Sequence, residues 1–487
     1  MDFAVIGGNP NSALKARRSG YKGLAKRGLE KRSEFGITGE DAYYAATLKI
    51  GSRGDANVVA VDTGSSDLWV MSSDVSCGVS KRSFDENTPL AHNRRLFTDS
   101  QVPSPSEELE KRGSNTYTSR GTCVAGGSFN YTASVSYSAN KSSSDFHILY
   151  GDGTYAGGLW GTDNISFGSV NISHCNFATA MVSTSDTGVF GIGLAADESS
   201  NSTYENLPMR FKSSGAINKI AYSLYLNNAN GSSGSVLFGA VDHAKYNGQL
   251  QKVPIINADP SYSSTPADLQ VVLNSITLKS SSQNITVSTT PIAALLDSGT
   301  SLTLLPSAIS QAFAKSLGGF MTKSGFYKVS CAYKSSSLFA EFNFSGVKIK
   351  VPLSDLISTS ITMESSCYLG IEEIPPTLSS DTPFAILGDN FLRNAYVVFD
   401  LEDYEISLAQ VKFSDTEDIE VISSSVPSAV KAASYSSTSF ATVATAIPTS
   451  TPSHLTAPTS SKSGSNAFYL PETLIFGVVS ACFVFLF

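Results

Sequence analysis

The chain has 487 residues, of which 16% are charged, and a formal net charge of −8. This length exceeds a single ordinary hydrophobic core, so we expect two lobes. The acidic balance, without a basic face on the main body, argues against nucleic acid as a partner. Short runs of β-branched and aromatic residues between Gly, Asn, Ser and Pro predict a mainly β protein. One helix is predicted with clear ends, over 306–319, between Pro306 and Gly318.

The N-terminal segment differs in charge from the rest of the chain. Residues 1–32 hold eight Lys or Arg and two acids, so the remainder carries a formal charge of −14. A basic segment ahead of an acidic body suits a propeptide held electrostatically over that body. It ends in Lys31-Arg32, so we expect a dibasic-cleaving protease to cut after Arg32; a solvated tail is the alternative. No cationic start or long apolar run marks a signal peptide, and we expect the natural start to lie upstream.

A carboxylate interrupts an apolar run in the stretch VVAVDTGSSDLWV, residues 58–70, where Asp62 stands at the end of a predicted strand. A turn is the simplest explanation for Asp, Gly and Ser together. The pattern returns at 293–305 as AALLDSGTSLTLL, with Asp297 in the equivalent place. Two copies of so specific a string predict a duplicated half.

A second repeated landmark supports the duplication. Val189-Phe190-Gly191 ends 129 residues after Asp62, and Ile386-Leu387-Gly388 ends 91 residues after Asp297. The difference of 38 can be placed in residues 78–122, a polar stretch without apolar alternation that we interpret as an inserted surface loop. The lobes are expected to span 33–222 and 223–421.

The cysteines and the sequons indicate an oxidising, secretory compartment. Five cysteines lie outside the apolar tail and lack metal-type spacing, so we expect disulfides and no metal site. Pairing within each half joins Cys77 to Cys123 and Cys331 to Cys367, which leaves Cys175 as a buried free thiol; other pairings stay open. Eight Asn-x-Ser/Thr sequons add modest support. They are Asn130, Asn140, Asn164, Asn171, Asn201, Asn230, Asn284 and Asn343.

The C-terminal end predicts a stalk and an anchor. Residues 422–464 are rich in Ser, Thr, Ala and Pro, which is typical of an O-glycosylated stalk that cannot bury a core. The apolar run that follows, 474–487, is short for a helix that spans a bilayer. We expect residues 465–487 to be a glycolipid (GPI) anchor signal that is removed, with attachment at Gly464 or alternatively at Asn466. A transmembrane helix is the alternative.

Asp62 and Asp297 end equivalent strands of two halves, so a pseudo-two-fold axis would bring them together between the lobes. Two such carboxylates share one proton, a known property of paired aspartates. The ionised member can take a proton from a water molecule while the protonated member hydrogen-bonds the substrate carbonyl. That chemistry hydrolyses peptide bonds without a metal or a cofactor. The neighbouring glycines and hydroxyls would support the pair: Thr63, Gly64, Ser65, Ser298, Gly299 and Thr300.

The paired DTGSSDLWV and DSGTS motifs resemble those of the pepsin-like aspartic proteases, over roughly 43–410. The resemblance implies an all-β, bilobal pepsin-like fold, in which two pseudo-two-fold related lobes flank a central cleft. It also implies that ILYGDGTYAGG, residues 148–158, is the β-hairpin flap that closes over the substrate; an ordinary glycine-rich hairpin is the alternative. Flap and substrate-binding roles would fall to Tyr150, Gly151, Asp152, Gly153 and Trp69, with Tyr150 hydrogen-bonded to Trp69. Ser298 stands where many relatives have Thr, which keeps the hydroxyl.

Within that family the chain looks most like the yapsin-type fungal proteases, on the basis of its tail, stalk, dibasic junction and long loop. This likeness implies a GPI-anchored endopeptidase of the plasma membrane or cell wall that cleaves at Lys or Arg in maturing or shedding surface proteins. Asp152 would accept the basic side chain, unless it only forms a turn. Cleavage after Arg112 would leave a monomer of two disulfide-linked chains; an uncut loop is the alternative. Competing functions are a broad-specificity nutritional protease and an inactive wall-binding protein.

Overall fold

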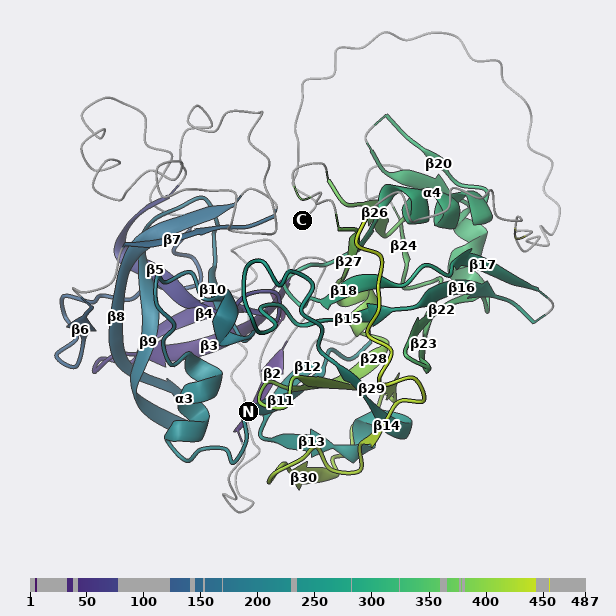
Figure 1. Cartoon of the computed structure of the whole chain (residues 1–487). Helices are drawn as coiled ribbons and strands as arrows, with labels where there is room; N and C mark the ends of the chain where they lie inside the picture. The colour runs from purple at the N-terminus through teal and green to yellow at the C-terminus, as the bar shows by residue number, and fades with distance from the viewer. Residues whose placement is uncertain are drawn as a thin grey trace, which may run out of the picture.

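The protein is two β lobes side by side, as Figure 1 shows in this computed structural model. The all-β, bilobal fold predicted from the sequence is present. The structure describes residues 5–6, 33–37, 43–77, 123–140, 145–151, 154–168, 170–228, 234–281, 283–323, 325–359, 366–375, 378, 382–443 and 455. Several predicted positions lie outside these ranges, namely Arg32, Arg112, Asp152, Gly153, Asn230, Gly464 and Asn466.

The N-terminal lobe is built on one nine-stranded sheet. In spatial order its strands are β1 (Val5–Ile6), β3 (Tyr43–Ile50), β4 (Asp55–Asp62), β10 (Gly188–Gly191), β5 (Leu68–Cys77), β9 (Val170–Ser183), β8 (Tyr155–Phe167) and β6 (Ser138–Ala139), with β7 (Phe146–Leu149) paired to β8. Apolar residues of these strands, such as Val59, Val61 and Phe190, are almost fully buried and join the main core of the molecule.

A seven-stranded sheet lies at the junction of the lobes, at the lower centre of Figure 1. Its order is β2 (Ser33–Ile37), β12 (Gly234–Phe238), β11 (Ala221–Tyr225), β28 (Ala395–Asp400), β29 (Glu405–Val411), β14 (Tyr246–Pro254) and β31 (Val430–Lys431). Strands from both expected lobes therefore share one sheet. The boundary that we expected between residues 222 and 223 falls inside β11, because this sheet crosses the junction.

The rest of the C-terminal lobe consists of four smaller sheets. The five-stranded sheet has the order β15 (Gln270–Leu273), β18 (Ile292–Leu296), β27 (Phe384–Leu387), β19 (Thr303–Leu305) and β26 (Ile371–Glu373). The others are β17 (Asn284–Ser288), β16 (Ser275–Lys279), β22 (Phe339–Phe344) and β23 (Val347–Pro352); β20 (Phe320–Met321), β21 (Tyr327–Val329), β25 (Cys367–Leu369) and β24 (Ile357–Thr359); and β13 (Ala240–Asp242) with β30 (Ile419–Val421).

The two repeated landmarks take the same place in both lobes. β10 runs parallel to β4 and antiparallel to β5, and β27 runs parallel to β18 and antiparallel to β19. The strand before each motif Asp is thus paired with the landmark strand of its own half. Gly388 is required here, because a Cβ on it would collide with the backbone carbonyls of Thr300 and Leu302. The duplication seen in the sequence is a repeated three-strand unit.

Helices are few among the described residues: α3 (Leu207–Ser213), α4 (Ser307–Ser316) and α5 (Asp389–Leu392), with 3₁₀ turns η2 (Ala195–Asp197), η3 (His243–Lys245) and η4 (Cys331–Ser335). α4 is the helix predicted over 306–319. Pro306 precedes it, and Gly318 follows it with a φ of +65°. The sequence analysis missed α3 and α5, which are too short to show a helical period. No described helix combines the length and the apolar character needed to cross a bilayer.

The cysteines are paired within each lobe. Cys77 is bonded to Cys123, with a Cα–Cα distance of 5.7 Å, at the two ends of the segment interpreted as an inserted loop. Cys331 is bonded to Cys367, and Cys175 is a buried free thiol. Burial raises the pKa of this thiol to about 12, so Cys175 is an inert core residue.

The beginning of the expected stalk is folded onto the C-terminal lobe, which corrects the boundary placed at residue 421. We call residues 419–443 together with Leu455 the strap; Figure 1 shows its yellow part running up the front of this lobe. β30 and β31 pair with strands of the body, and Ile422, Val426 and Leu455 are at most 3% exposed. Widely spaced apolar residues and backbone hydrogen bonds hold the strap, and composition alone does not reveal them.

Candidate active site

Asp62 and Asp297 meet between the lobes. They are 7% and 5% exposed, at the ends of β4 and β18. Each lies against the motif glycine of the other lobe: a Cβ at Gly64 would be 2.6 Å from Asp297 Oδ1, and one at Gly299 would collide with Asp62 Oδ1. The glycines are therefore needed so that the two carboxyls can approach.

Both carboxyls receive matching hydrogen bonds from their own motifs. The Gly64 N–H donates to Asp62 Oδ1 and the Gly299 N–H to Asp297 Oδ1, each at 2.8 Å. The second oxygens accept from hydroxyls, with Ser65 donating to Asp62 and Thr300 donating to Asp297 at 2.6 Å. The two carboxyls therefore have equivalent donors, a glycine N–H to Oδ1 and a hydroxyl to Oδ2.

Burial raises the pKa of the Asp62 carboxyl well above its ordinary value, and the adjacent Asp297 raises it further by its charge and by a hydrogen bond. The Ser65 hydroxyl and the Gly64 N–H act in the opposite direction. The two carboxyls are coupled, so the pair retains a proton at pH values where a solvated Asp has lost it. A pair of this kind can both donate to a carbonyl oxygen and take a proton from water.

Comparison with known proteins agrees with this geometry. Residues 43–411 match the family described as eukaryotic aspartyl protease. The chain belongs to this family. It is 38% identical to aspartic proteinase yapsin-3 of Saccharomyces cerevisiae, over 87% of this chain and 77% of that protein. It is 39% identical to aspartic proteinase 3 of the same yeast, over 88% and 78%, and 37% identical to secreted aspartic protease 9 of Candida albicans, over 87% of both chains. The protein is thus an aspartic endopeptidase of the pepsin type.

Below the dyad, four hydrogen bonds join the lobes of the protease. Thr63 Oγ1 donates to the Leu296 carbonyl at 2.7 Å and accepts from the Ser298 N–H at 2.9 Å. In the reverse direction, Ser298 Oγ donates to the Val61 carbonyl at 2.9 Å and accepts from the Thr63 N–H at 3.2 Å. All of these groups are buried, so this contact holds the two carboxyls in register.

We expect Thr63→Ala to destabilise the protease by about 2 kcal/mol or more, because it leaves the buried Leu296 carbonyl and Ser298 N–H unpaired. Thermal unfolding of the purified protein measures this. Thr416→Ala removes an exposed hydroxyl that is hydrogen-bonded to a nearby turn residue, Ser414, and should change stability by less than about 0.5 kcal/mol. Equal Tm values for the two variants would contradict the role of the interlobe contact.

The flap predicted from the resemblance is a hairpin of β7 and β8. Leu149 pairs with Tyr155, and the Tyr150 N–H donates to the Thr154 carbonyl at 2.8 Å. Trp69 Nε1 donates to the Tyr150 hydroxyl at 2.7 Å. Trp69 is fully buried, so its indole N–H orients Tyr150. This bond is the one implied by the family resemblance.

Tyr150→Phe should lower kcat/KM roughly tenfold, because it leaves the buried Trp69 N–H without this acceptor and frees the ring. Steady-state hydrolysis of a peptide measures the change. Tyr262→Phe, at a partly exposed position in the loop between β14 and β15, is the matched control. If Tyr150→Phe hydrolyses peptide as fast as Tyr262→Phe, the hydroxyl does not position the flap.

The sequence analysis missed one residue that meets the flap and one near the dyad. Leu378 lies in the loop after β26 and meets the flap, since a Cβ on Gly151 would be 3.1 Å from its side chain. Asp389 is 2% exposed; burial raises the pKa of its carboxyl well above the ordinary value, and Asp297 adds to this while Arg393 opposes it. Leu378 gives no sequence signal, but Asp389 directly follows the landmark Gly388, and that position could have revealed it.

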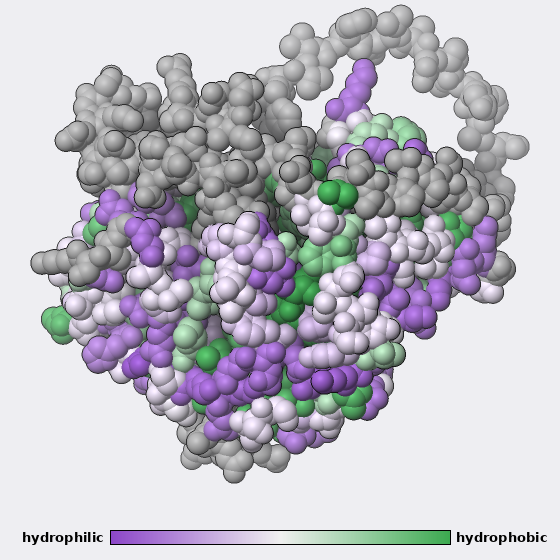
Figure 2. Space-filling model, viewed as in Figure 1, coloured by the Kyte–Doolittle hydropathy of each residue, from purple (hydrophilic) through white to green (hydrophobic). Residues whose placement is uncertain are grey.

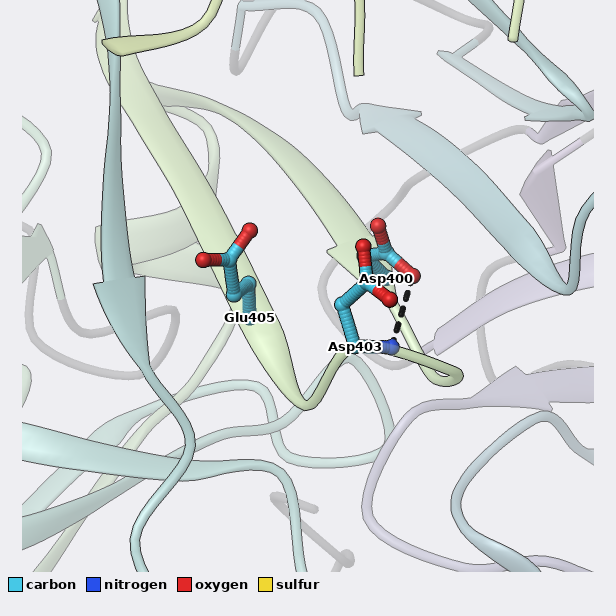
Figure 3. A group of neighbouring side chains, drawn as sticks. All are labelled: Asp400, Asp403 and Glu405. Atoms are coloured by element: carbon cyan, nitrogen blue, oxygen red, sulfur yellow. Dashed lines mark hydrogen bonds between the residues drawn. The ribbon is translucent and has the colours of Figure 1, made fainter. Parts of the chain in front are cut away.

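An acidic cluster elsewhere in the protease is an ion-pair network. Figure 3 shows Asp400 and Asp403 at the turn between β28 and β29, with Glu405 at the start of β29. Lys219 Nζ lies 3.3 Å from Asp400 Oδ1 and 2.9 Å from Asp403 Oδ2, and Lys252 Nζ lies 2.8 Å from Glu405 Oε2. Each of the three carboxylates is therefore paired with a lysine ammonium group.

Most sequon asparagines are accessible. Asn130 and Asn343 are half-buried. Five others are exposed: Asn140, Asn164, Asn171, Asn201 and Asn284. Glycosylation at these positions stays a prediction.

Proposed function

We propose that this aspartic protease acts at the cell surface and cleaves at Lys or Arg, singly or in pairs, to mature or shed surface and cell-wall proteins. The observation that carries the chemistry is the buried pair Asp62 and Asp297, each packed on the motif glycine of the other lobe. One member holds the shared proton and donates it toward the substrate carbonyl, while the other takes a proton from the attacking water. The preference for basic side chains does not follow from this pair and needs separate support.

Two acidic residues, Asp152 and Glu372, are candidates for recognising a basic side chain. Asp152 is expected to accept a basic side chain, although it lies outside the described residues. Glu372 lies in β26, whose following loop contacts the flap at Leu378. Glu372 Oε1 is buried without a hydrogen-bond partner in the described part of the chain, and burial raises the pKa of this carboxyl. A cationic substrate side chain would offset that burial.

Maturation by cleavage after Arg32 is consistent with the sheet topology. β2 begins at Ser33 and pairs with β12 at the edge of the seven-stranded sheet. A cut at this bond would leave β2 intact as the first strand of the mature protease. We also propose anchoring through Gly464, glycosylation at the sequons and cutting of the loop after Arg112. Mass spectrometry of the mature termini and glycopeptides would test all of these together.

Peptide hydrolysis tests the specificity directly. The purified protease is incubated with matched peptides that carry Lys-Arg or Phe-Phe, from acid to neutral pH, with and without pepstatin. We expect pepstatin-sensitive cleavage of the Lys-Arg peptide. Preferred cleavage of Phe-Phe would favour a broad-specificity nutritional protease, and no cleavage of either would favour a wall-binding protein. Glu372→Gln should reduce the preference for Lys-Arg while leaving Phe-Phe cleavage unchanged.

A further inference from the structure

The hairpin of β20 and β21 exposes apolar side chains at the outer end of the C-terminal lobe. Phe320 is 62% exposed and Met321 is 42% exposed. Adjacent strand residues point to opposite faces, so exposure of both means that β20 stands clear of the body. Tyr327 and Val329 of β21 are buried and fix the hairpin to the lobe. Figure 2 shows pale green apolar atoms beside purple hydrophilic ones at the upper right, where Figure 1 labels β20. Among the described residues this is the one adjacent pair of exposed large apolar side chains.

Lysines surround this hairpin in a chain of net negative charge. Lys315 lies in the last turn of α4, Lys323 follows β20 and Lys328 lies opposite Phe320 in β21. None of these three forms an ion pair with a described residue, whereas Lys279 and Lys348 both pair with Glu341 on a neighbouring sheet. Exposed apolar residues among lysines are typical of surfaces that rest on anionic lipid.

Leu455, the last residue that the structure describes, contacts the body beside the same hairpin. The Leu455 N–H donates to the Ser316 carbonyl at 2.8 Å, and the Tyr333 hydroxyl donates to the Leu455 carbonyl at 2.9 Å. Ser316 ends α4 and Tyr333 lies in η4. From there to Gly464 the chain spans at most about 30 Å when fully extended. An anchor at Gly464 would hold this end of the C-terminal lobe close to a bilayer.

We propose that the β20–β21 hairpin and its lysines form a lipid-contacting face that binds an anionic bilayer surface. Its residues are Lys315, Phe320, Met321, Lys323 and Lys328. The tether argument rests on the anchor proposed above, but the lipid contact itself does not need it. Contact through this face would orient the protease on the membrane and not merely keep it nearby.

Vesicle binding without the anchor tests the proposal. A form of the chain that ends at Ser465 keeps every residue that the structure describes. It is mixed with vesicles of phosphatidylcholine alone or of phosphatidylcholine with phosphatidylinositol, and binding is measured by co-sedimentation. We expect binding to the anionic vesicles that weakens with salt. Phe320→Ser with Met321→Ser should lower the partition coefficient roughly tenfold, and reversal of the three lysines to Glu should lower it further.

The control is Phe413→Ser with Lys412→Glu, which changes an exposed apolar residue and an exposed lysine elsewhere. This control should bind vesicles as the unmodified chain does. Hydrolysis of a soluble peptide, measured on every variant, should be unchanged, and it separates failure of the lipid face from failure of the protease. Absent binding, or equal loss in the control, would overturn the proposal. A hairpin variant that alters self-association instead of vesicle binding would also overturn it, by identifying a second copy of the chain as the partner.

Discussion

Asp62→Asn and Asp297→Asn should each abolish peptide hydrolysis, with kcat reduced roughly 10³-fold or more. Either change removes one member of the proton-sharing pair. The remaining Asp cannot both take a proton from the water and donate one to the substrate carbonyl. Asn has the shape of Asp, and the hydrogen bonds from Gly64 and Gly299 can rearrange around it. Peptide cleavage at several pH values measures the loss. Asp415→Asn, at an exposed position, should retain full activity.

Asp62→Asn should stabilise the folded protein near neutral pH, although it abolishes activity. Because the folded-state pKa of Asp62 is raised, the folded protein binds more protons than the unfolded chain between the ordinary pKa of Asp and the raised value. Stability from this group is therefore largest in acid and is lost as the pH rises through that window. Asp62→Asn should unfold at a higher temperature than the unmodified protein near neutral pH and at a similar temperature in acid. A lower Tm at neutral pH would contradict the raised pKa.

The sequence could predict the dyad because catalysis depends on residues that recur in a short, rigid pattern. The duplication can be predicted from two repeated motifs alone. These are the strings around Asp62 and Asp297 and the landmarks that end at Gly191 and Gly388. Hydrogen bonds from Gly64 and Gly299 then follow from the motif itself. The interlobe contact of Thr63 with Leu296 needed coordinates, since no spacing within one motif specifies a partner in the other.

Other features could not be predicted because their residues act singly. Leu378 meets the flap from an irregular loop, and α3 and α5 are shorter than the window over which periodicity is informative. The strap is the clearest case: Ile422, Val426 and Leu455 are too far apart to form a period, and the Ser/Thr-rich composition around them is the same as that of a solvated stalk. Composition indicates that such a segment cannot form a core of its own, but it does not indicate whether the segment packs against another part of the protein.

Truncation of the chain after Val421 should therefore destabilise the C-terminal lobe, although it removes a segment whose composition predicts no folded structure. Three large apolar side chains are lost from the core, each contributing about 1.5–3 kcal/mol, and the conformational entropy of the released strap offsets part of this. We expect a net loss of about 3 kcal/mol in the free energy of unfolding, or a fall in Tm of roughly 6–12 °C. Calorimetry compares this form with one that ends at Ser465.

The strap also supports the catalytic strand, so its loss should reduce activity before the protein unfolds. The Ala441 N–H donates to the Pro291 carbonyl at 2.8 Å, directly before β18, the strand that leads to Asp297. Point variants test whether the buried side chains of the strap stabilise the protein. Ile422→Ala should cost about 2–3 kcal/mol, because Ile422 is fully buried and the loss cannot exceed that of removing the whole strap. Val443→Ala, at a strap residue that is 52% exposed, should change stability by less than about 0.5 kcal/mol. Equal stability of these two variants would show that the strap is a stalk after all.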